Sequence, residues 1–491
     1  MRKVSKTDFC IHLTEKARQD PGLPVPNPTA SAWQSIPHEL ANHQSSALPA
    51  NTSIAIIGSG MTGISTAYHI LQKSPHLNVT VLEARSLTSG ATGRNGGHCK
   101  EVPYVNYPEL KSLVGKEGAM KIVRFRLAQL DALFETAAAL PGVMEESQLR
   151  RVEGVDLYYD RAVFEEMKLK RESYLEDFPE ERDRWLVWEG KDLEEKFDAA
   201  NAVGCMTGPA GALWPYRFVG GVTTALFNKD HYPNFNLETN TPVESVSMSG
   251  LDEYPYEIKT SRGSIFAQQV VHCTNGHAGH LLPGLRGPLF PLRGQMTVQS
   301  RPSSFPNVGD KRSWLLHYAP GYEYITQSPS PSGEIYLGGG LLQALTEPEI
   351  EESNIDVGNI RDDQHNAAAL RYIKKTMEQG FRNGKGSEIL KKWTGVMGYT
   401  IDDLPIIGKV PSSISGRKLE SERGAEWVGA GFCGHGMAYC WLTGRALAEM
   451  VVNGEENVGD WFPRKELACS EERLGRISLE GAIRSFLWTV A

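Results

Sequence analysis

Residues 53–83 carry the clearest hydrophobic pattern in the chain. A short apolar run from Ser53 to Ile57 predicts a buried strand, and the segment after it predicts a helix that starts near Met61. A second run, Val79-Thr-Val-Leu, predicts another strand that ends on an acid, Glu83. A glycine-rich turn separates the first strand from the helix. This alternation of strand, turn, helix and strand predicts the start of an α/β domain.

Helical patterns recur along the rest of the chain. Residues 116–140 place apolar side chains at helical spacing, and 159–200 are also predicted to be helical, with a charged and solvated face. Residues 362–383 and the apolar stretch 437–452 are further predicted helices.

Strand patterns lie between these helices. They occupy 241–247, 257–260, 269–273, 289–300, 314–327 and 334–341. The last three alternate apolar and polar residues with Pro and Gly between them, which predicts an antiparallel sheet. The whole pattern favours an α/β cofactor domain built from discontinuous segments, with an α+β domain inserted. Residues 1–50, rich in Pro, Ser, Asn and His, are expected to form an irregular arm.

The first turn, Gly58-x-Gly60-x-x-Gly63, has the spacing of a dinucleotide-binding site. Gly58 permits the tight turn, Gly60 lets the backbone approach a pyrophosphate, and Gly63 lets helix and strand pack closely. The helix N-terminus then offers free N–H groups to phosphates. Glu83 lies twenty residues after Gly63, where its carboxylate can accept hydrogen bonds from ribose hydroxyls. This unit predicts binding of an adenine dinucleotide and leaves NAD and FAD both open.

Bulk properties narrow the class of protein. At 491 residues, with 40% hydrophobic and 22% charged residues, the chain suits a globular protein of two or three domains. A net charge of −8 gives no general attraction to nucleic acid or to an anionic membrane, and no apolar run predicts a membrane span. Seven scattered cysteines without a CxxC pair support neither a metal site nor a disulfide framework, and favour a cytoplasmic location.

Two further glycine-rich segments decide between the dinucleotides. Residues 89–98 hold four glycines in ten positions, so their backbone can lie flat against a planar ring. Residues 431–436 form a Gly-x-x-Gly-His-Gly turn before an apolar helix, whose N-terminus could stabilise negative charge on a reduced ring. Only a flavin, extending beyond the pyrophosphate, requires both surfaces.

Four segments together resemble the D-amino-acid oxidase-like FAD-dependent oxidoreductases, the group of glycine oxidase and sarcosine oxidase. They are the dinucleotide unit, residues 89–98, residues 270–276, and residues 403–408 with 431–436. The variant Ala91-Thr-Gly-Arg-Asn-Gly-Gly97 is closest to the γ-glutamylputrescine oxidase branch. The resemblance implies an FAD-binding Rossmann-like domain at 51–110, 205–285 and 390–460. It implies a substrate domain with an antiparallel sheet at 111–204 and 286–389, with an arm at 1–50 and a tail at 461–491.

The resemblance also implies which residues contact FAD. The expected contacts are Gly58, Ser59, Gly60, Met61, Thr62, Gly63, Glu83, Ala84, Arg85, Ala91, Thr92, Gly93, Arg94, Asn95, Gly96, Gly97, His98, Val243, Thr274, Asn275, Gly276, Gly434, His435, Gly436 and Met437. For Arg94 the alternative is a salt bridge near Glu83, without any contact to the flavin.

The chain departs from relatives that hold their flavin covalently. Met397 stands where sarcosine oxidase has its linking cysteine, and no histidine occupies the linking position used by dimethylglycine dehydrogenases. FAD is therefore expected to be non-covalent, and Cys99 is the one residue that could overturn this. Ala438 replaces the lysine of sarcosine oxidase that follows the Gly-His-Gly turn, which removes a grip on a substrate carboxylate.

Candidate catalytic residues come from the inserted sheet and the last turn. Arg293 is expected on a loop into that sheet, where it could pair with flavin or a substrate carboxylate. Tyr322 or Tyr324 could form an aromatic wall for a cationic amine, although alternating tyrosines on a strand are more often packing residues. His435 is a catalytic candidate with a structural role as its alternative. Asp402-Asp403 could attract an ammonium group, but an acid that caps a turn is the commoner case.

The expected activity is oxidation of a primary or secondary amine: an amino acid, an N-methyl amino acid or a polyamine-like compound. Hydride would pass from the carbon next to nitrogen to flavin N5, the imine would hydrolyse, and O₂ would become H₂O₂. One alternative is a dehydrogenase that uses another electron acceptor, and a second is a subunit that holds FAD without catalysis. The expected partners are a small-molecule amine and O₂, with no nucleic acid and no membrane; the sequence leaves the substrate and the oligomeric state open.

Overall fold

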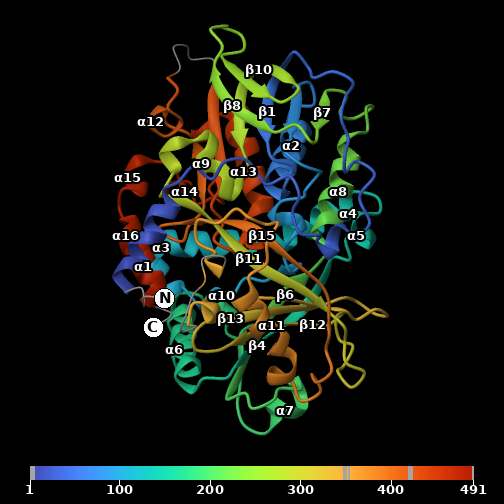
Figure 1. Ribbon diagram of the computed structural model, residues 1–491, viewed down its shortest axis with the longest axis vertical. Helices are drawn as coiled ribbons and strands as arrows, with labels where there is room; N and C mark the ends of the chain where they lie inside the picture. The colour runs from blue at the N-terminus through green and yellow to red at the C-terminus, as the bar shows by residue number, and fades with distance from the viewer. Residues whose placement is uncertain (1–5, 347–350, 352–353, 419–423, 489–491) are drawn as a thin grey trace.

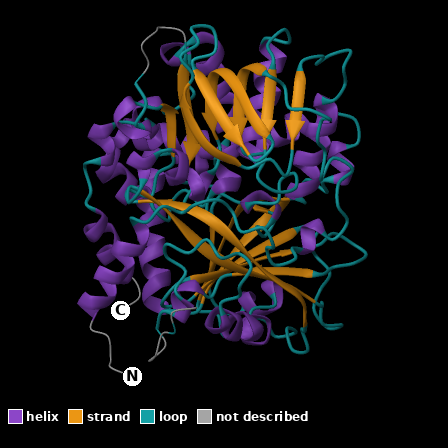
Figure 2. Cartoon of the chain, turned by 45° about the horizontal axis from the view of Figure 1, so that its top comes forward, coloured by secondary structure: helices purple, strands orange, loops and turns teal. Residues whose placement is uncertain are grey.

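The computed structural model describes residues 6–346, 351, 354–418 and 424–488. Residues 1–5 of the predicted arm and 489–491 of the predicted tail lie outside the described residues. Two β-sheets, each with helices packed on it, divide the molecule into an upper and a lower part (Figure 1; Figure 2). This α/β architecture with a second, largely antiparallel sheet confirms the predicted fold class.

The upper sheet has the order β16-β17-β10-β1-β2-β7, and β8 and β9 extend it as an antiparallel ribbon beside β10. Its strands are β1 (Asn51–Ile57), β2 (Val79–Leu82), β7 (Phe235–Glu238), β8 (Val243–Met248), β9 (Tyr256–Thr260), β10 (Gly263–His272), β16 (Ile406–Lys409) and β17 (Ala425–Ala430). β1 pairs in parallel with β2 on one side and β10 on the other, so it is central, and its residues from Ile54 to Ile57 are all apolar and buried.

Alternate residues of β1 enter different cores. Ile54 and Ile56 face a cluster formed with α2 (Met61–Lys73) and α13 (Cys440–Asn453), whereas Ala55 and Ile57 face the β8–β9 ribbon. The helices α2 and α13 pack closely at Gly444. A Cβ added there would lie 2.4 Å from the Ser65 Cβ. The upper sheet is therefore covered on both faces, as a parallel sheet requires.

The lower sheet has the order β15-β11-β14-β13-β12-β4-β6-β3, with β5 paired to β6. Its strands are β3 (His98–Cys99), β4 (Arg150–Tyr158), β5 (Leu186–Trp188), β6 (Gly204–Ala212), β11 (Leu289–Gln299), β12 (Arg312–His317), β13 (Tyr322–Gln327), β14 (Ile335–Gly338) and β15 (Ile389–Thr400). Three of these strands, β3, β6 and β15, fall largely in ranges predicted for the FAD-binding domain. The chain therefore passes between the two sheets at other points than the sequence suggested.

The remaining helices cover the two sheets and the join between them. They are α1 (Lys6–Ala17), α3 (Tyr107–Leu127), α4 (Gln129–Ala139), α5 (Val143–Glu146), α6 (Arg161–Asp177), α7 (Asp192–Phe197), α8 (Pro215–Leu226), α9 (Ala278–Leu281), α10 (Leu341–Ala344), α11 (Ala367–Gly380), α12 (Ser412–Ser415), α14 (Arg464–Leu467), α15 (Glu471–Leu474) and α16 (Leu479–Trp488). The helix predicted at 116–140 is two helices, and the helical prediction at 159–200 missed the short strand β5. The arm is also not wholly irregular, because α1 packs through Leu13 and Ala17 against Leu479 and Ile483 of α16.

Candidate active site

The dinucleotide turn has the close contacts that its glycines predict. Gly58 has a φ of +107°, and a Cβ there would lie 2.6 Å from the Cys273 carbonyl oxygen. A Cβ on Gly63 would lie 2.0 Å from the Gly58 carbonyl oxygen. The turn leads directly from β1 into α2, and neither position in it has room for a side chain.

Glu83 is fixed at the end of β2. One carboxylate oxygen accepts hydrogen bonds from the Ser59 amide (3.0 Å) and the Ser59 hydroxyl (2.7 Å), and the other accepts one from the Arg85 amide (3.0 Å). These bonds hold the carboxylate beside the glycine turn, where lone pairs that remain can accept from a ligand hydroxyl.

One continuous cavity of about 670 Å³ joins the three glycine-rich segments. It begins at the β1–α2 turn, passes residues 91–96 and ends between the lower sheet and the turn before α13. Most of the predicted cofactor residues line it: Gly58, Gly60, Met61, Thr62, Glu83, Ala84, Arg85, Ala91, Thr92, Arg94, Asn95, Gly96, His98, Val243, Thr274, Asn275, Gly434, His435, Gly436 and Met437. Ser59, Gly63, Gly93, Gly97 and Gly276 lie behind this surface and support it. An elongated dinucleotide with a ring at one end fits these walls.

Arg94 in the glycine loop is almost completely buried. Its Nε donates to the Thr394 carbonyl oxygen (2.6 Å) and lies 3.5 Å from an Asp362 carboxylate oxygen, while its Nη1 is buried without a hydrogen-bond partner at the cavity wall. Burial lowers the pKa of Arg94 to about 10 despite Asp362, so the guanidinium is still charged at neutral pH. The orphaned Nη1 leaves a cationic donor for a ligand, although the salt bridge predicted as its alternative also exists, through Asp362.

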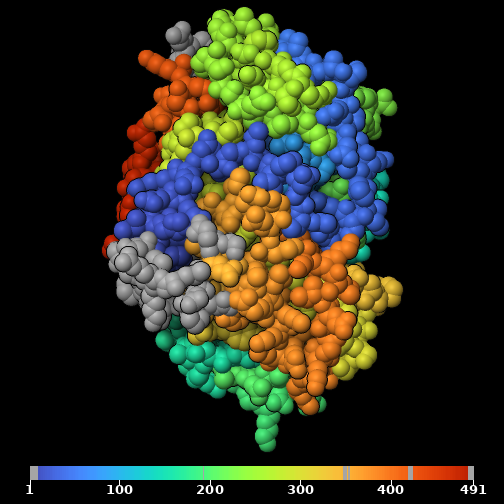
Figure 3. Space-filling model, viewed as in Figure 1, coloured from blue at the N-terminus to red at the C-terminus, as the bar shows by residue number. Residues whose placement is uncertain are grey.

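The N-terminal arm closes the cavity over this loop. The Ser31 hydroxyl donates to the Gly93 carbonyl oxygen (2.8 Å), and the Trp33 indole donates to the Asn95 carbonyl oxygen (2.5 Å). Residues 22–24 line the cavity directly. Figure 3 shows the arm as a blue band across the middle of the visible face, between the upper and lower parts. The arm therefore forms one wall of the predicted cofactor site.

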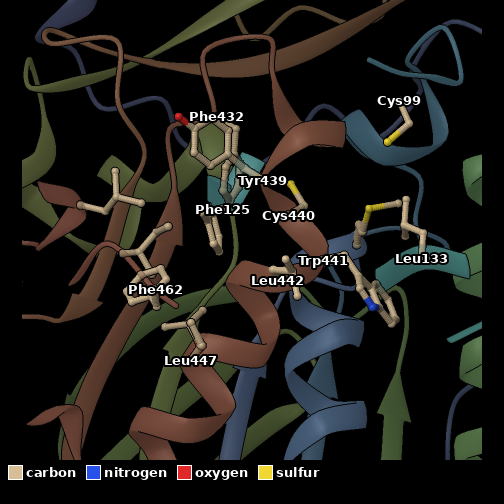
Figure 4. Close-up of a cluster of buried hydrophobic side chains, with 14 of the residues drawn as sticks. Cys99, Phe125, Leu133, Phe432, Tyr439, Cys440, Trp441, Leu442, Leu447 and Phe462 are labelled. Carbon is tan, nitrogen blue, oxygen red and sulfur yellow. The ribbon is translucent and has the colours of Figure 1, made fainter. Parts of the chain in front are cut away.

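The turn at 431–436 forms the opposite end of the cavity. The Gly431 amide donates to the Asn275 side-chain oxygen (3.0 Å), and a Cβ on Gly434 would lie 3.0 Å from the Tyr399 hydroxyl. The chain then makes a short 3₁₀ turn, Gly436–Ala438, before α13 begins at Cys440. Phe432 and Tyr439 on either side of this turn point into the apolar cluster around Phe125 (Figure 4). Packing thus anchors both sides of the turn.

The predicted substrate-side residues do not all meet. Tyr322 of β13 is 46% exposed and lines the cavity, and burial raises its pKa. Tyr324 also lines the cavity, and its ring packs so closely on Gly96 that a Cβ there would lie 2.6 Å from a ring carbon. His435 lines the same end. Two tyrosines and the histidine therefore gather where the flavin ring is expected.

The expectation for Arg293 was wrong. The residue lies inside β11, is completely buried, and does not line the cavity; its Nε binds an Asp356 carboxylate oxygen at 2.7 Å. A charge can occupy the strand interior because Asp356 balances it there. Arg293 thus stabilises the lower sheet and has no position from which to contact a substrate in this cavity.

Several residues at the cavity wall carry no signal in the sequence. Lys100 forms an ion pair with Asp156, and Arg126 forms one with Glu101 at 2.5 Å; all four side chains are buried. Tyr399, near the end of β15, also lines the cavity. Arg126 is one charged residue of a predicted helix, and no local pattern marks any of these residues as part of a site.

The imidazoles at this end are neutral at physiological pH. Burial, together with the charge of Arg126, lowers the pKa of His435 to about 4. Burial likewise lowers the pKa of His317 to about 4, and its ring stacks on Tyr158 with centroids 4.5 Å apart. Neutral rings can accept a hydrogen bond from a ligand without adding positive charge.

Cys99 is placed as an inert thiol. It is 4% exposed, does not line the large cavity, and its sulfur donates to the Met437 carbonyl oxygen at 3.3 Å. Burial raises the pKa of Cys99 to about 12, so the reactive thiolate is scarce. Met397, by contrast, lines the cavity but offers no group for a covalent link. Both findings suit a non-covalent FAD.

The described ranges contain no cluster of three or more His, Cys, Asp or Glu side chains suited to hold a metal ion. Across the same ranges, every helix is too short or too polar to span a bilayer.

Comparison with known proteins gives the family. Residues 53–450 match the family described as FAD dependent oxidoreductase (DAO). Gamma-glutamylputrescine oxidoreductase of Escherichia coli (strain K12) is 22% identical over 419 residues, which cover 81% of this chain and 83% of that protein. L-proline dehydrogenase from P. horikoshii has a similar fold, with a TM-score of 0.62 at 19% identity over 85% of this chain and 98% of that one. Glycine oxidase from Geobacillus kaustophilus gives a TM-score of 0.60 at 16% identity, over 82% and 95% of the two chains. Because the family match covers most of the length and includes all three glycine-rich segments, the chain belongs to the DAO family of FAD-dependent oxidoreductases.

Proposed function

We propose that this protein oxidises a primary or secondary amine with bound FAD and passes the electrons to O₂. The observation that carries the proposal is the single cavity that runs from the dinucleotide turn to a compartment walled by Tyr322, Tyr324, Tyr399 and His435. FAD, when bound, would supply the redox chemistry, which is the removal of a hydride from the carbon next to the amine nitrogen. The imine product then hydrolyses in water, and O₂ is reduced to H₂O₂.

The residues of the chain bind and orient the reactants. The β1–α2 turn and Glu83 hold the adenosine and pyrophosphate half, with the free Nη1 of Arg94 as an additional cationic donor. The tyrosines form the compartment wall for the substrate, and aromatic faces attract a cationic amine as it enters. The neutral His435 and His317 can accept a hydrogen bond at the same end.

The names of related proteins support the substrate class. The E. coli relative is a gamma-glutamylputrescine oxidoreductase, and the structural neighbours include glycine oxidase and L-proline dehydrogenase. All of these act at an amine nitrogen. The names differ in the rest of the substrate, and one is an oxidase whereas another is a dehydrogenase. The substrate and the electron acceptor of this protein are therefore what a direct experiment must identify.

The test is a purified holoprotein mixed anaerobically with a panel of amines and amino acids. We expect at least one amine to bleach the flavin absorbance, and admission of air to restore it with release of H₂O₂. Bleaching that air does not reverse would replace the oxidase with a dehydrogenase. Bound flavin that no amine reduces would refute the proposed activity.

A further inference from the structure

The charged groups on the cavity wall are unequally paired. The described residues that line it include four lysine and arginine side chains, and each has a carboxylate partner. Arg85 and Arg94 share Asp362, Lys100 has Asp156, and Arg126 has Glu101. Of the acids on the same wall, Glu83 holds backbone amides and Asp362 holds the two arginines. Asp403, unlike Asp362, forms no ion pair with any of the described residues.

Asp403 lies at the substrate end of the cavity. It follows β15 in the turn at 401–404, close to Tyr322 and Tyr399, whose pKa values its charge helps to raise. Asp403 lines the cavity with an accessible surface, and burial raises its pKa to about 6. The Cys433 thiol and Arg126 act in the opposite direction and favour the charged form.

The backbone explains part of this residue choice but not its charge. Asp403 has a φ of +58°, in the left-handed region that glycine, asparagine and aspartate adopt most readily. Any of the three would satisfy the turn. The neighbouring Asp402 already stabilises this turn, because it binds Arg473 through two contacts of 2.8 and 3.0 Å. The carboxylate of Asp403 is hydrogen-bonded to the Cys433 thiol, but it has no ion-pair partner among the described residues.

We propose that Asp403 binds an ammonium group of the substrate and makes the site select cationic amines without a carboxylate over α-amino acids. This inference rests on the proposed amine oxidation and names the substrate class for it. A carboxylate without an ion-pair partner among the described residues, on the same cavity wall as two tyrosine rings, is suited to an ammonium ion. A substrate carboxylate, in contrast, would meet Lys100 and Arg126 already neutralised by Asp156 and Glu101, and Ala438 offers no cation in place of the missing lysine. The ammonium can be the reacting amino group before it loses its proton, or a second amino group of a diamine.

Two variants separate the charge from the turn. Asp403→Asn and Asp403→Gly both remove the carboxylate and both suit a φ of +58°. We expect each to keep the flavin content and melting temperature of the parent protein. Asp363→Asn is the matched control, since it removes an acid of the same kind outside the cavity.

Two readouts test the proposal on the holoprotein. The first is a titration with tetramethylammonium, which cannot be oxidised to an imine. Its binding is measured as a change in flavin absorbance. We expect saturable binding that weakens at least tenfold in both Asp403 variants and is unchanged in Asp363→Asn. The second is anaerobic flavin reduction by butylamine, 1,4-diaminobutane and 2-aminobutyric acid. A greater loss of affinity for the diamine assigns Asp403 to the second amino group, and an equal loss for both amines assigns it to the reacting one.

Equal tetramethylammonium binding in the parent protein and both variants would overturn the proposal, as would faster reduction by the amino acid than by either amine. The two failures are distinct. If no amine reduces the flavin, the proposed function fails, whereas the tetramethylammonium titration still reports on Asp403 alone.

Discussion

Asp362 supports two buried arginines on the wall of the cofactor cavity, and its removal should destabilise the protein measurably. Its two carboxylate oxygens each bind a different nitrogen of Arg85 at 3.1 Å, and one of them lies 3.5 Å from Arg94. The side chains of Asp362, Arg85 and Arg94 are only 4%, 11% and 1% exposed. The substitution Asp362→Asn keeps the shape of the side chain and removes the charge that both guanidinium groups share.

The magnitude follows from leaving buried charge without its partner. Breaking a buried ion pair by removing one member typically costs about 3–5 kcal/mol of unfolding free energy. The entropy of unfolding is roughly 2 cal/mol/K per residue, which gives about 1 kcal/mol/K for a chain of this length. The melting temperature should therefore fall by roughly 3–5 °C.

The adjacent acid provides the control. Asp363 pairs with Arg361 at 2.7 Å, but these side chains are 25% and 52% exposed, so Asp363→Asn should cost less than about 1 kcal/mol. The assay is thermal unfolding of the holoprotein, with the released flavin measured alongside. If the two variants melt at the same temperature, Asp362 does not contribute the stability that its contacts indicate, and the reasoning is wrong.

Three further outcomes can be checked. Gly63→Ala should abolish stable flavin binding, measured as flavin per protein after gel filtration, because its Cβ would lie 2.0 Å from the Gly58 carbonyl oxygen; a fully yellow variant would contradict this. Glu426 is buried, which opposes its ionisation, but Arg417 and His272 hydrogen-bond it and hold its pKa at about 2, below the ordinary 4.5. Because this pKa is depressed, the stability that Glu426 contributes is complete above pH 4.5 and is lost as the pH falls towards 2. The unfolding free energy of Glu426→Gln should therefore change less with acid over that window than that of the parent protein. Parallel acid curves for the two proteins would exclude the mechanism. Acid precipitation should leave the flavin in the supernatant for both the parent protein and Cys99→Ser, since Cys99 does not line the cavity; a yellow pellet from the parent alone would show a covalent link.

The cofactor half of the site was accessible from sequence because local rules determine it. The spacing of Gly58, Gly60 and Gly63, and the acid at the end of the next strand, are requirements of one turn and two neighbouring strands. The loop at 89–98 and the turn at 431–436 are likewise local glycine-rich segments, and the structure brings both to one cavity.

The substrate half depends on contacts that no local pattern encodes. Arg293 has the sequence context of a loop, but Asp356, 63 residues further on, allows it to be buried within a strand. Lys100 and Arg126 reach the cavity only because Asp156 and Glu101 neutralise them there. The sequence shows Asp403 only as an acid in a turn. Whether it forms an ion pair with the described residues depends on where the fold positions the neighbouring charges.

The arm that covers the glycine loop has a consequence for the order of assembly. Thr29 donates its amide to the Asp362 carbonyl oxygen at 2.7 Å, its hydroxyl accepts the Thr394 amide at 2.9 Å, and it also binds Arg94. These partners are separated from Thr29 by more than 330 residues in two of the three cases. On a ribosome the arm emerges well before residues 362–394, yet it can dock only after that segment has been made and folded. This wall of the cofactor site is thus completed by a segment synthesised more than 330 residues later, and flavin capture should wait for that segment.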